Sequence, residues 1–276
     1  MSRIEQRFSA LQKEGRAGLV TYVAAGDPDP DTSLRLLAGL PGAGADLIEI
    51  GMPFSDPMAD GPIIQEAGQR ALKQGMTLRR TLDLVRELRR LDEATPIVLM
   101  GYYNPIYRYG PAAFARDAVA AGIDGVIVVD LPPEEDAELT APAHAEGLDF
   151  VRLATPTSGE ARLPQIVEHA SGFIYYVAIA GITGTRSAAA ADVAAAVARL
   201  RRFTPLPVAV GFGIRTPAQA VEVARAADAA VVGSSLVQCL ALNLNPDSTA
   251  KPGLVDAVLA EVRALAQGVR NARKTL

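Results

Sequence analysis

The 276-residue chain has few of the side chains on which metal, disulfide or Schiff-base chemistry depends. It has no tryptophan, one cysteine and two histidines. Cys239 alone cannot form an internal disulfide, and its apolar surroundings favour a place in the core. His144 and His169 lie in polar helical segments far from any glycine-rich turn, which argues against a histidine-based metal site. We therefore expect no bound metal.

Lysine is equally scarce, and no lysine follows a predicted strand, which disfavours a Schiff-base mechanism. With 27 basic and 31 acidic residues the net charge is −4, so no strongly basic face for nucleic acid is expected. The chain has no apolar run of the roughly 18 residues that a membrane helix needs. Its first residues lack a signal-peptide pattern. These absences predict a globular, cytoplasmic protein that binds neither nucleic acid nor membrane. The four lysines are Lys13, Lys73, Lys251 and Lys274.

Apolar runs and helical patterns alternate eight times along the chain. This alternation predicts a (β/α)₈ TIM barrel, an α/β fold. Residues 3–14 form an amphipathic pattern before the first run, which predicts an extra N-terminal helix packed outside the barrel. No linker or low-complexity break divides the chain, so residues 1–276 are expected to form one domain. The predicted strands are 18–24, 46–50, 96–101, 125–129, 149–153, 173–177, 207–210 and 229–232.

One of these strands contains a carboxylate. In the run 46–50, Leu47 and Glu49 point to one face and Ile48 and Ile50 to the other. A strand that is apolar on both faces belongs to a buried parallel sheet, where a charged carboxylate is costly. Asp60 follows on a loop stiffened by prolines. Two carboxylates in different environments suit acid/base chemistry. The structural alternative is that Glu49 is a buried ion-pair partner and that Asp60 caps the helix beginning near Pro62.

The last three predicted strands are each followed by a glycine-bearing turn. Bare backbone N–H groups and a helix N-terminus favour an anion there, and barrels commonly bind phosphate at this place. The alternative is that these glycines only make tight turns. Residues 181–187, with glycines on both sides of Ile182-Thr183, read as a lid or as an ordinary exposed loop.

Four aromatic side chains lie at or near predicted strand ends in a chain with only 5% aromatic residues. Together they could wall a flat apolar ligand, although each taken singly is more often core packing. Tyr175 shares a face with Phe173, which we expect to be the barrel interior. The four are Tyr22, Tyr102, Tyr175 and Phe212.

The stretch Glu49-Ile-Gly-Met-Pro-Phe-Ser-Asp-Pro-Met-Ala-Asp-Gly-Pro62 resembles the signature of the tryptophan synthase alpha family. Further matching motifs follow in the same order, namely Asp130-Leu-Pro-Pro, Ala180-Gly-Ile-Thr-Gly and Gly211-Phe-Gly-Ile. The resemblance implies a (β/α)₈ lyase of tryptophan biosynthesis. Such a subunit cleaves indole-3-glycerol phosphate to indole and glyceraldehyde 3-phosphate by a retro-aldol reaction.

The resemblance also implies roles for single residues. Glu49 and Asp60 match the two catalytic carboxylates, with Asp60 expected to stay ionised on a wetter loop, and Tyr175 matches an active-site tyrosine. We expect Tyr22, Tyr102, Phe212 and Thr183 around the indole, with Thr183 closing against Asp60. The phosphate-binding turns match Gly184, Gly213, Gly233 and Ser234, and Ser235 would be an extra donor where many members have alanine.

A partner is implied as well. The family passes indole to a beta subunit that holds pyridoxal phosphate, so no cofactor is expected in this chain and an alpha2beta2 complex is expected. Pro53, Asp56 and Asn104 fall in loops that would face the partner, and the loop at 102–107 adds aromatic tips. The alternative is that these loops only frame a small-molecule pocket. The run Ala154-Thr-Pro-Thr-Ser158 departs from the usual family pattern and leaves details of the indole pocket open.

Two other functions fit part of the pattern. A catalytically weak, phosphate-binding subunit that activates a partner enzyme would keep the glycine turns but would not need both carboxylates. The second alternative is another phosphate-binding barrel, such as a prenyl transferase or a sugar-phosphate isomerase. A transferase of that kind calls for Mg²⁺ and an acidic cluster, without the Pro-Phe-Ser-Asp-Pro loop.

Overall fold

A barrel of parallel strands forms the centre of the computed structural model, which describes residues 1–178, 186–211 and 213–273. The strands pair in the order β5-β4-β3-β2-β1-β9-β8-β7-β6. The fold predicted from the alternating pattern is therefore confirmed. The strands are β1 Gly18–Ala24, β2 Leu47–Gly51, β3 Ile97–Gly101, β4 Gly125–Val128, β5 Asp149–Phe150, β6 Arg152–Ala154, β7 Ile174–Val177, β8 Val208–Gly211 and β9 Ala229–Val232.

The fifth predicted strand is divided in two at Val151. Its first part, β5, pairs with β4, whereas its second part, β6, pairs with β7. One continuous stretch of chain therefore joins the two ends of the sheet. This explains why the nine short strands of the described residues make an eight-fold barrel.

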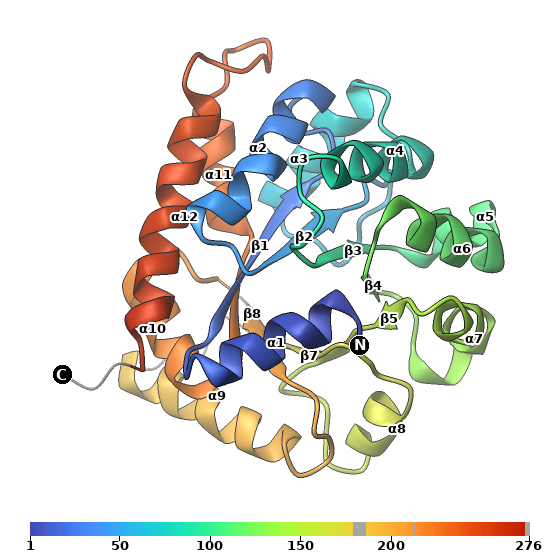
Figure 1. Ribbon diagram of the computed structural model, residues 1–276, viewed down its shortest axis with the longest axis vertical. Helices are drawn as coiled ribbons and strands as arrows, with labels where there is room; N and C mark the ends of the chain where they lie inside the picture. The colour runs from blue at the N-terminus through green and yellow to red at the C-terminus, as the bar shows by residue number, and fades with distance from the viewer. Residues whose placement is uncertain (179–185, 212, 274–276) are drawn as a thin grey trace.

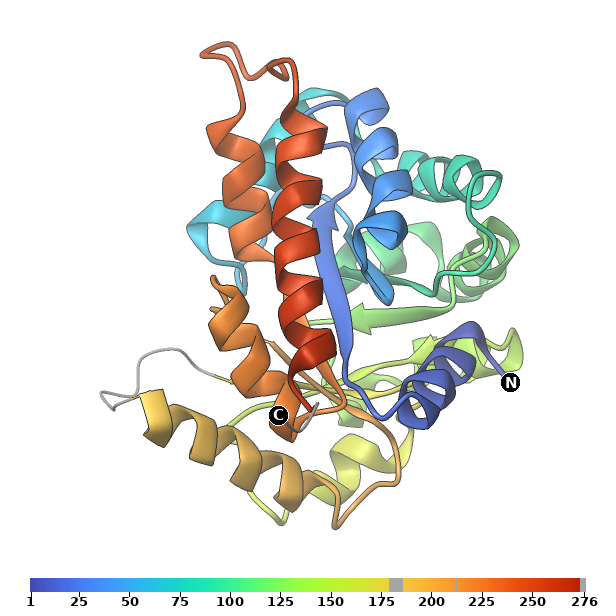
Figure 2. The same cartoon turned by 60° about the vertical axis from the view of Figure 1, so that its left-hand side comes forward.

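Helices surround the strands (Figure 1 and Figure 2). A large apolar cluster packs the outward faces of the strands against them, including Ile48 and Ile50 of β2. One expected loop, residues 102–107, is helical instead and forms the N-cap and first part of α5. Pro105 is compatible with this helix because it falls in the first turn, where proline is tolerated. The helices are α1 Arg3–Lys13, α2 Pro30–Ala43, α3 Pro62–Lys73, α4 Leu78–Arg89, α5 Tyr103–Tyr109, α6 Pro111–Ala121, α7 Ala137–Ala145, α8 Leu163–Glu168, α9 Arg186–Leu200, α10 Pro217–Ala226, α11 Ser234–Leu242 and α12 Leu254–Asn271, with a 3₁₀ turn η1 at Pro133–Glu135.

Helix α1 confirms the predicted N-terminal helix, and it packs across one end of the barrel. Its buried side chains Ile4, Phe8 and Leu11 join a cluster with residues of the barrel interior, and the Phe8 ring lies 5.7 Å from that of Phe173. The amphipathic pattern correctly predicts a helix with one buried face, but that face closes the N-terminal end of the barrel. Chemistry is thereby left to the opposite end of the strands.

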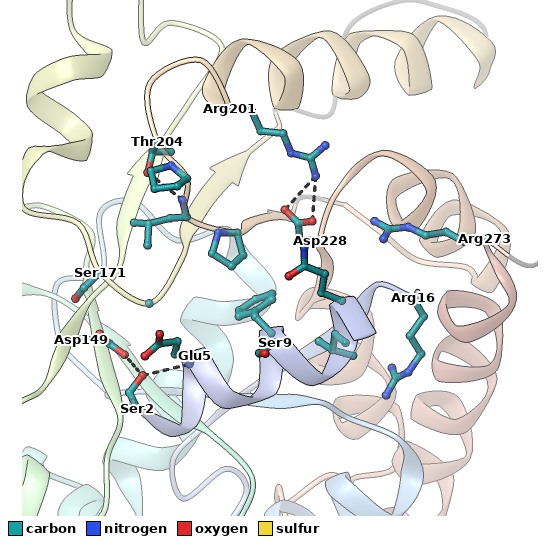
Figure 3. A pocket seen from close by; sticks show the side chains of 17 residues that line it. Ser2, Glu5, Ser9, Arg16, Asp149, Ser171, Arg201, Thr204, Asp228 and Arg273 are labelled. Carbon is teal, nitrogen blue, oxygen red and sulfur yellow. Dashed lines mark hydrogen bonds and ion pairs between the residues drawn. The ribbon is translucent and has the colours of Figure 1, made fainter. Parts of the chain in front are cut away.

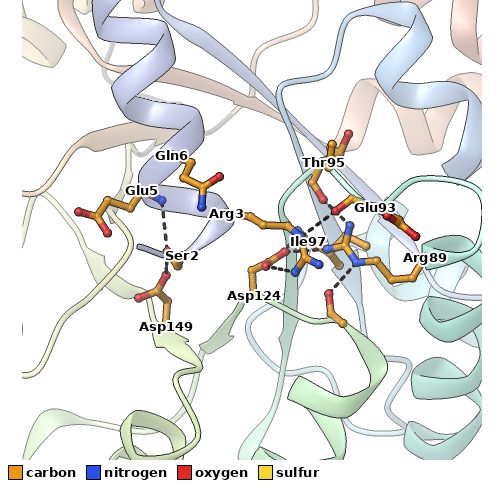
Figure 4. A network of polar contacts seen from close by, with 12 residues as sticks. Ser2, Arg3, Glu5, Gln6, Arg89, Glu93, Thr95, Ile97, Asp124 and Asp149 are labelled. Carbon is orange, nitrogen blue, oxygen red and sulfur yellow. Dashed lines mark hydrogen bonds and ion pairs between the residues drawn. The ribbon is translucent and has the colours of Figure 1, made fainter.

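Polar contacts hold α1 in this place (Figure 4). The Ser2 hydroxyl caps the helix by accepting from the Glu5 N–H and donates to Asp149 at 2.7 Å. Arg3 and Arg89 both pair with Asp124, at 2.9 and 2.7 Å. The end of the barrel is therefore fixed by charge pairs as well as by apolar packing.

Three similar short motifs, Ala43-Gly-Ala-Asp46, Ala121-Gly-Ile-Asp124 and Ala226-Ala-Asp228, form equivalent turns before strands β2, β4 and β9. Asp46, Asp124 and Asp228 each accept a backbone N–H from a neighbouring strand, those of Leu19, Ile97 and Val208. Each aspartate also pairs with arginine, so the repeated carboxylates have a structural function at this end of the barrel. The arginine partners are Arg16 for Asp46, Arg3 and Arg89 for Asp124, and Arg201 for Asp228.

A groove of about 810 Å³ lies beside α1 at this same end (Figure 3). Several of its charged side chains are already engaged: Arg201 pairs with Asp228, and Asp149 accepts from Ser2. Arg273 donates to the carbonyls of Ala224 and Ala227. Size alone therefore does not make this groove the reactive site.

We expect Asp124→Ala to lower the free energy of unfolding by about 3 kcal/mol, because it leaves the Arg89 guanidinium without its ion-pair partner and the Ile97 N–H without its acceptor. Urea unfolding followed by circular dichroism measures this. Asp83→Ala is the matched control, since Asp83 pairs with Arg86 on an exposed helix face, and its effect should stay within about 0.5 kcal/mol. Equal effects of the two substitutions would contradict the structural function of the aspartates.

Candidate active site

A pocket at the C-terminal ends of the strands brings the two predicted carboxylates together. Glu49 comes from β2 and Asp60 from the loop that precedes α3. Tyr22 of β1 and Tyr175 of β7 form two further walls. The pocket lining is Tyr22, Glu49, Asp60, Ile64, Met100, Tyr175, Gly213, Ile214, Val231, Gly233 and Ser234.

Glu49 is almost entirely removed from solvent. Its side chain is 1% exposed, and among the described residues its Oε2 has no hydrogen-bond partner. Burial, together with the nearby Asp60 charge, raises the pKa of Glu49 to about 8. Glu49 is thus a carboxyl group that is protonated near neutral pH and can donate or accept a proton. The alternative of a buried ion-pair partner finds no cation bonded to it in the described part of the chain.

Asp60 differs from expectation in one respect. The loop is largely exposed and Asp60 is half-buried, so Asp60 is wetter than Glu49, but burial nevertheless raises the pKa of Asp60 above its ordinary value. A hydrogen bond with Tyr102 acts in the opposite direction and lowers the pKa. Asp60 is also not the cap of α3, since Gly61 occupies that position.

Two glycines make room for the tyrosines of the pocket. A Cβ on Gly51 would lie 2.1 Å from the Tyr22 hydroxyl, and one on Gly211 would lie 2.3 Å from the Tyr175 hydroxyl. Burial raises the pKa of both tyrosines well above the ordinary value, with a further contribution from the carboxylates, so both remain neutral. Any larger residue at either glycine would displace an aromatic wall.

The glycine turns after β8 and β9 border the same pocket. Gly213 adopts a φ of 66°, which favours glycine. Gly233 precedes α11, whose first turn has no side-chain cap, so the backbone N–H groups of that turn can donate hydrogen bonds to an anion. Ser234 lines the pocket, whereas Ser235 is 8% exposed and its hydroxyl has no partner among the described residues. The predicted residues Thr183, Gly184 and Phe212 lie outside the described residues.

Comparison with known proteins identifies the family. A protein-family model described as "Tryptophan synthase alpha chain" matches residues 8–269. The chain belongs to the tryptophan synthase alpha chain family. The family resemblance predicted from the sequence motifs is thereby confirmed. Members of this family are lyases that cleave indole-3-glycerol phosphate in tryptophan biosynthesis, and the chain is an enzyme of this class.

Solved structures of the family agree over the whole chain. Tryptophan synthase subunit alpha from Legionella pneumophila str. Paris is 37% identical, with 98% of this chain and 99% of that chain covered and a TM-score of 0.90. A tryptophan synthase alpha chain from Legionella pneumophila subsp. pneumophila is 36% identical, with both chains fully covered and a TM-score of 0.90. The aminoacrylate-bound form of tryptophan synthase from M. tuberculosis is 35% identical, with coverage of 98% and 100% and a TM-score of 0.85.

The predicted partner-facing residues of this family member lie in different environments. Asp56 and Asn104 are exposed, the first on the loop before α3 and the second on α5. Pro53 is buried and borders a small pocket behind the loop, together with Phe54 and Tyr102. Only Asp56 and Asn104 therefore present their side chains at the surface.

Sequence reasoning missed four apolar residues of the pocket. Met100 was accessible to prediction, because it shares the inward face of β3 with Val98. Ile64 comes from α3, so its place in the pocket depends on how that helix packs and not on strand parity. Ile214 and Val231 complete the set. Among the described residues no cluster of histidine, cysteine and acidic side chains could hold a metal, and no described helix is long and apolar enough to span a membrane.

Proposed function

We propose that this chain cleaves indole-3-glycerol phosphate with Glu49 as the proton-transfer group and Asp60 as the anionic partner of the indole ring. The observation that carries this assignment is the buried, unpaired Glu49 facing Asp60 in a pocket that also includes the uncapped start of α11. An activating subunit without catalysis would have no use for a carboxyl group kept protonated in an apolar site.

The proposed chemistry follows from these two protonation states. Protonated Glu49 gives its proton to C3 of the indole and becomes a carboxylate. The positive charge that develops at the ring N–H is stabilised by Asp60. The Glu49 carboxylate then removes the proton of the C3′ hydroxyl, the C3–C3′ bond breaks, and its electron pair restores the indole while the aldehyde forms. Glu49 ends as it began, and the protonated indole ring is the only electron sink required.

The remaining pocket residues suit the two ends of the substrate. The phosphate would accept hydrogen bonds from the backbone N–H groups of Gly213 after β8 and of Gly233 and Ser234 at the start of α11, with Gly184 and Ser235 as further proposed donors. Tyr22, Tyr175, Phe212 and Thr183 would wall the indole, with Tyr102 behind the loop. We further infer that residues 1–276 act as one domain in the cytoplasm.

The partner is part of the same proposal. A tryptophan synthase beta subunit with pyridoxal phosphate would take up the indole in an alpha2beta2 complex. The exposed Asp56 and Asn104 support a docking face formed by the loop before α3 and by α5. Because that loop also carries Asp60, docking on it could raise the rate of cleavage.

Indole release from indole-3-glycerol phosphate by the isolated chain tests the catalytic proposal. Slow but stoichiometric formation of indole and glyceraldehyde 3-phosphate is expected, without added metal or cofactor. No indole above the uncatalysed rate, despite measurable substrate binding, would instead favour a purely activating subunit.

We expect Asp56→Ala to reduce the acceleration by a beta subunit at least about fivefold while the basal rate of the isolated chain changes less than about twofold. Indole formation with and without the partner measures both quantities. Asp256→Ala, an exposed aspartate on α12, is the matched control and should leave the acceleration intact. Equal loss of basal and accelerated rates in Asp56→Ala would mean that the loop is a pocket wall.

A further inference from the structure

Tyr102 lies between the catalytic loop and the helix that carries Asn104. It directly precedes α5 and is 3% exposed, so its ring is part of the packed interior. The ring lies 5.5 Å from that of Phe54, on the loop at 52–61. Tyr102 therefore touches the loop of Asp60 and, through the backbone, the first turn of α5.

The Tyr102 hydroxyl makes two contacts with adjacent residues of the loop. It accepts the backbone N–H of Ala59 at 2.9 Å. The hydroxyl also lies beside the carboxylate of Asp60, where a phenol O–H can donate, and this contact lowers the pKa of Asp60. One oxygen atom thus binds the loop backbone at Ala59 and faces the carboxylate of the next residue.

A second contact holds the loop without touching the carboxylate. Gln65 of α3 donates its side-chain N–H to the carbonyl of Asp60 at 2.8 Å. This bond anchors the backbone of the loop but leaves the Asp60 side chain free to rotate. The orientation of the carboxylate therefore depends on Tyr102 and not on Gln65.

We infer that Tyr102 is a positioning residue whose hydroxyl holds the Asp60 carboxylate toward the pocket and links it to α5. This inference rests on the proposed function, because it gives the hydroxyl a purpose only if Asp60 acts in cleavage. It also assigns Tyr102 a place different from the indole wall expected from sequence, since Tyr102 borders the small pocket behind the loop.

The Tyr102 hydroxyl acts on the pKa of Asp60 together with the other titratable groups around that carboxylate. The titratable groups that face it are Glu49 from β2, Tyr22 from β1 and Tyr102 itself. Burial and the Asp60 charge raise the pKa of Tyr102 to about 12, so the phenol keeps its proton. Donation of that proton to the carboxylate favours the ionised form and lowers the pKa of Asp60.

Tyr102→Phe tests the inference, because it keeps the ring against Phe54 and removes only the hydroxyl. Indole formation by the isolated chain should show kcat reduced about 10- to 100-fold with KM changed less than about threefold. The loss of the donated hydrogen bond raises the pKa of Asp60. The acid limb of the kcat profile should therefore move to higher pH, and a thermal melt confirms that the variant is folded.

Two control variants separate positioning from general stabilisation. Tyr109→Phe removes a phenol hydroxyl that donates to Asp117 at 2.7 Å near the end of α5, and it should leave both kcat and the acid limb unchanged. Gln65→Leu removes the backbone anchor of the loop. It should lower kcat without moving the acid limb, because the carboxylate keeps its donor.

The outcomes distinguish this inference from the proposed function. Wild-type kcat and an unmoved acid limb in Tyr102→Phe would overturn the inference. So would a reduced kcat with an unmoved limb, as for Gln65→Leu, because that result assigns Tyr102 to loop packing alone. Asp60→Asn is expected to be severely impaired; if it retained full turnover, the function proposed for Asp60 would fail, whatever Tyr102→Phe does.

Discussion

Replacement of Glu49 by glutamine should lower indole formation by about 10²- to 10⁴-fold, the usual worth of a general acid/base group. Glutamine keeps the size and the hydrogen-bonding shape of the side chain, and Glu49 is too deeply buried for water to take over its protons. Without a titrating group, neither the proton for C3 nor the removal of the hydroxyl proton is available. Steady-state indole release, with substrate binding measured separately by calorimetry, determines the effect.

The matched control is Glu87→Gln, an exposed glutamate on α4. It makes the same chemical change far from the pocket and should leave turnover within about twofold of wild type, as for other surface changes. Binding by Glu49→Gln should be retained, because the phosphate turns are untouched. Wild-type turnover by Glu49→Gln would refute the assignment of proton transfer to this residue.

The second large effect is expected at the start of α11. Gly233→Asp should raise the KM for indole-3-glycerol phosphate by about 100-fold, because a carboxylate would repel the phosphate at close range. The new side chain would also crowd Tyr22, whose Cβ lies 3.1 Å from the position of an added Cβ. Initial rates over a range of substrate concentrations give the KM.

Gly233→Ala separates charge from crowding. The methyl group meets the same Tyr22 atoms but carries no charge, so a much smaller rise in KM is expected. A soaked sulfate or glycerol phosphate should bind near Gly213, Gly233 and Ser234 in the wild type. Equal effects of the alanine and aspartate variants, or an anion bound only elsewhere, would contradict a phosphate site here.

The strand pattern predicted the site because residues that alternate along a strand point their side chains to opposite faces of the sheet. Glu49 faces the interior for the same reason that Ile48 and Ile50 face the helices. The position of each strand end then places the following turn at the C-terminal side of the barrel. Local sequence therefore sufficed for Glu49, Tyr175 and Gly233, whose places follow from strand parity and strand ends.

Relations between distant segments could not be predicted in this way. Amphipathicity showed that α1 buries one face but not that the face closes the barrel against Phe173. The pattern of Tyr103-Asn-Pro105 resembled a loop, although proline is compatible with the first turn of α5. The bond between Tyr102 and the loop of Asp60 depends on how two segments 43 residues apart come together. The partial burial that raises the pKa of Asp60 depends on the same tertiary packing.

The pH dependence of indole release by the isolated chain tests the central claim most directly, namely that Glu49 begins the reaction protonated. Because burial raises its pKa to about 8, kcat/KM should fall as the pH rises through about 8 and should fall again at low pH as Asp60 takes up a proton. The residual activity of Glu49→Gln should lack the basic limb. A wild-type profile that stays flat from about pH 6 to about pH 10 would contradict the account, because no group with the raised pKa of Glu49 would then control the reaction.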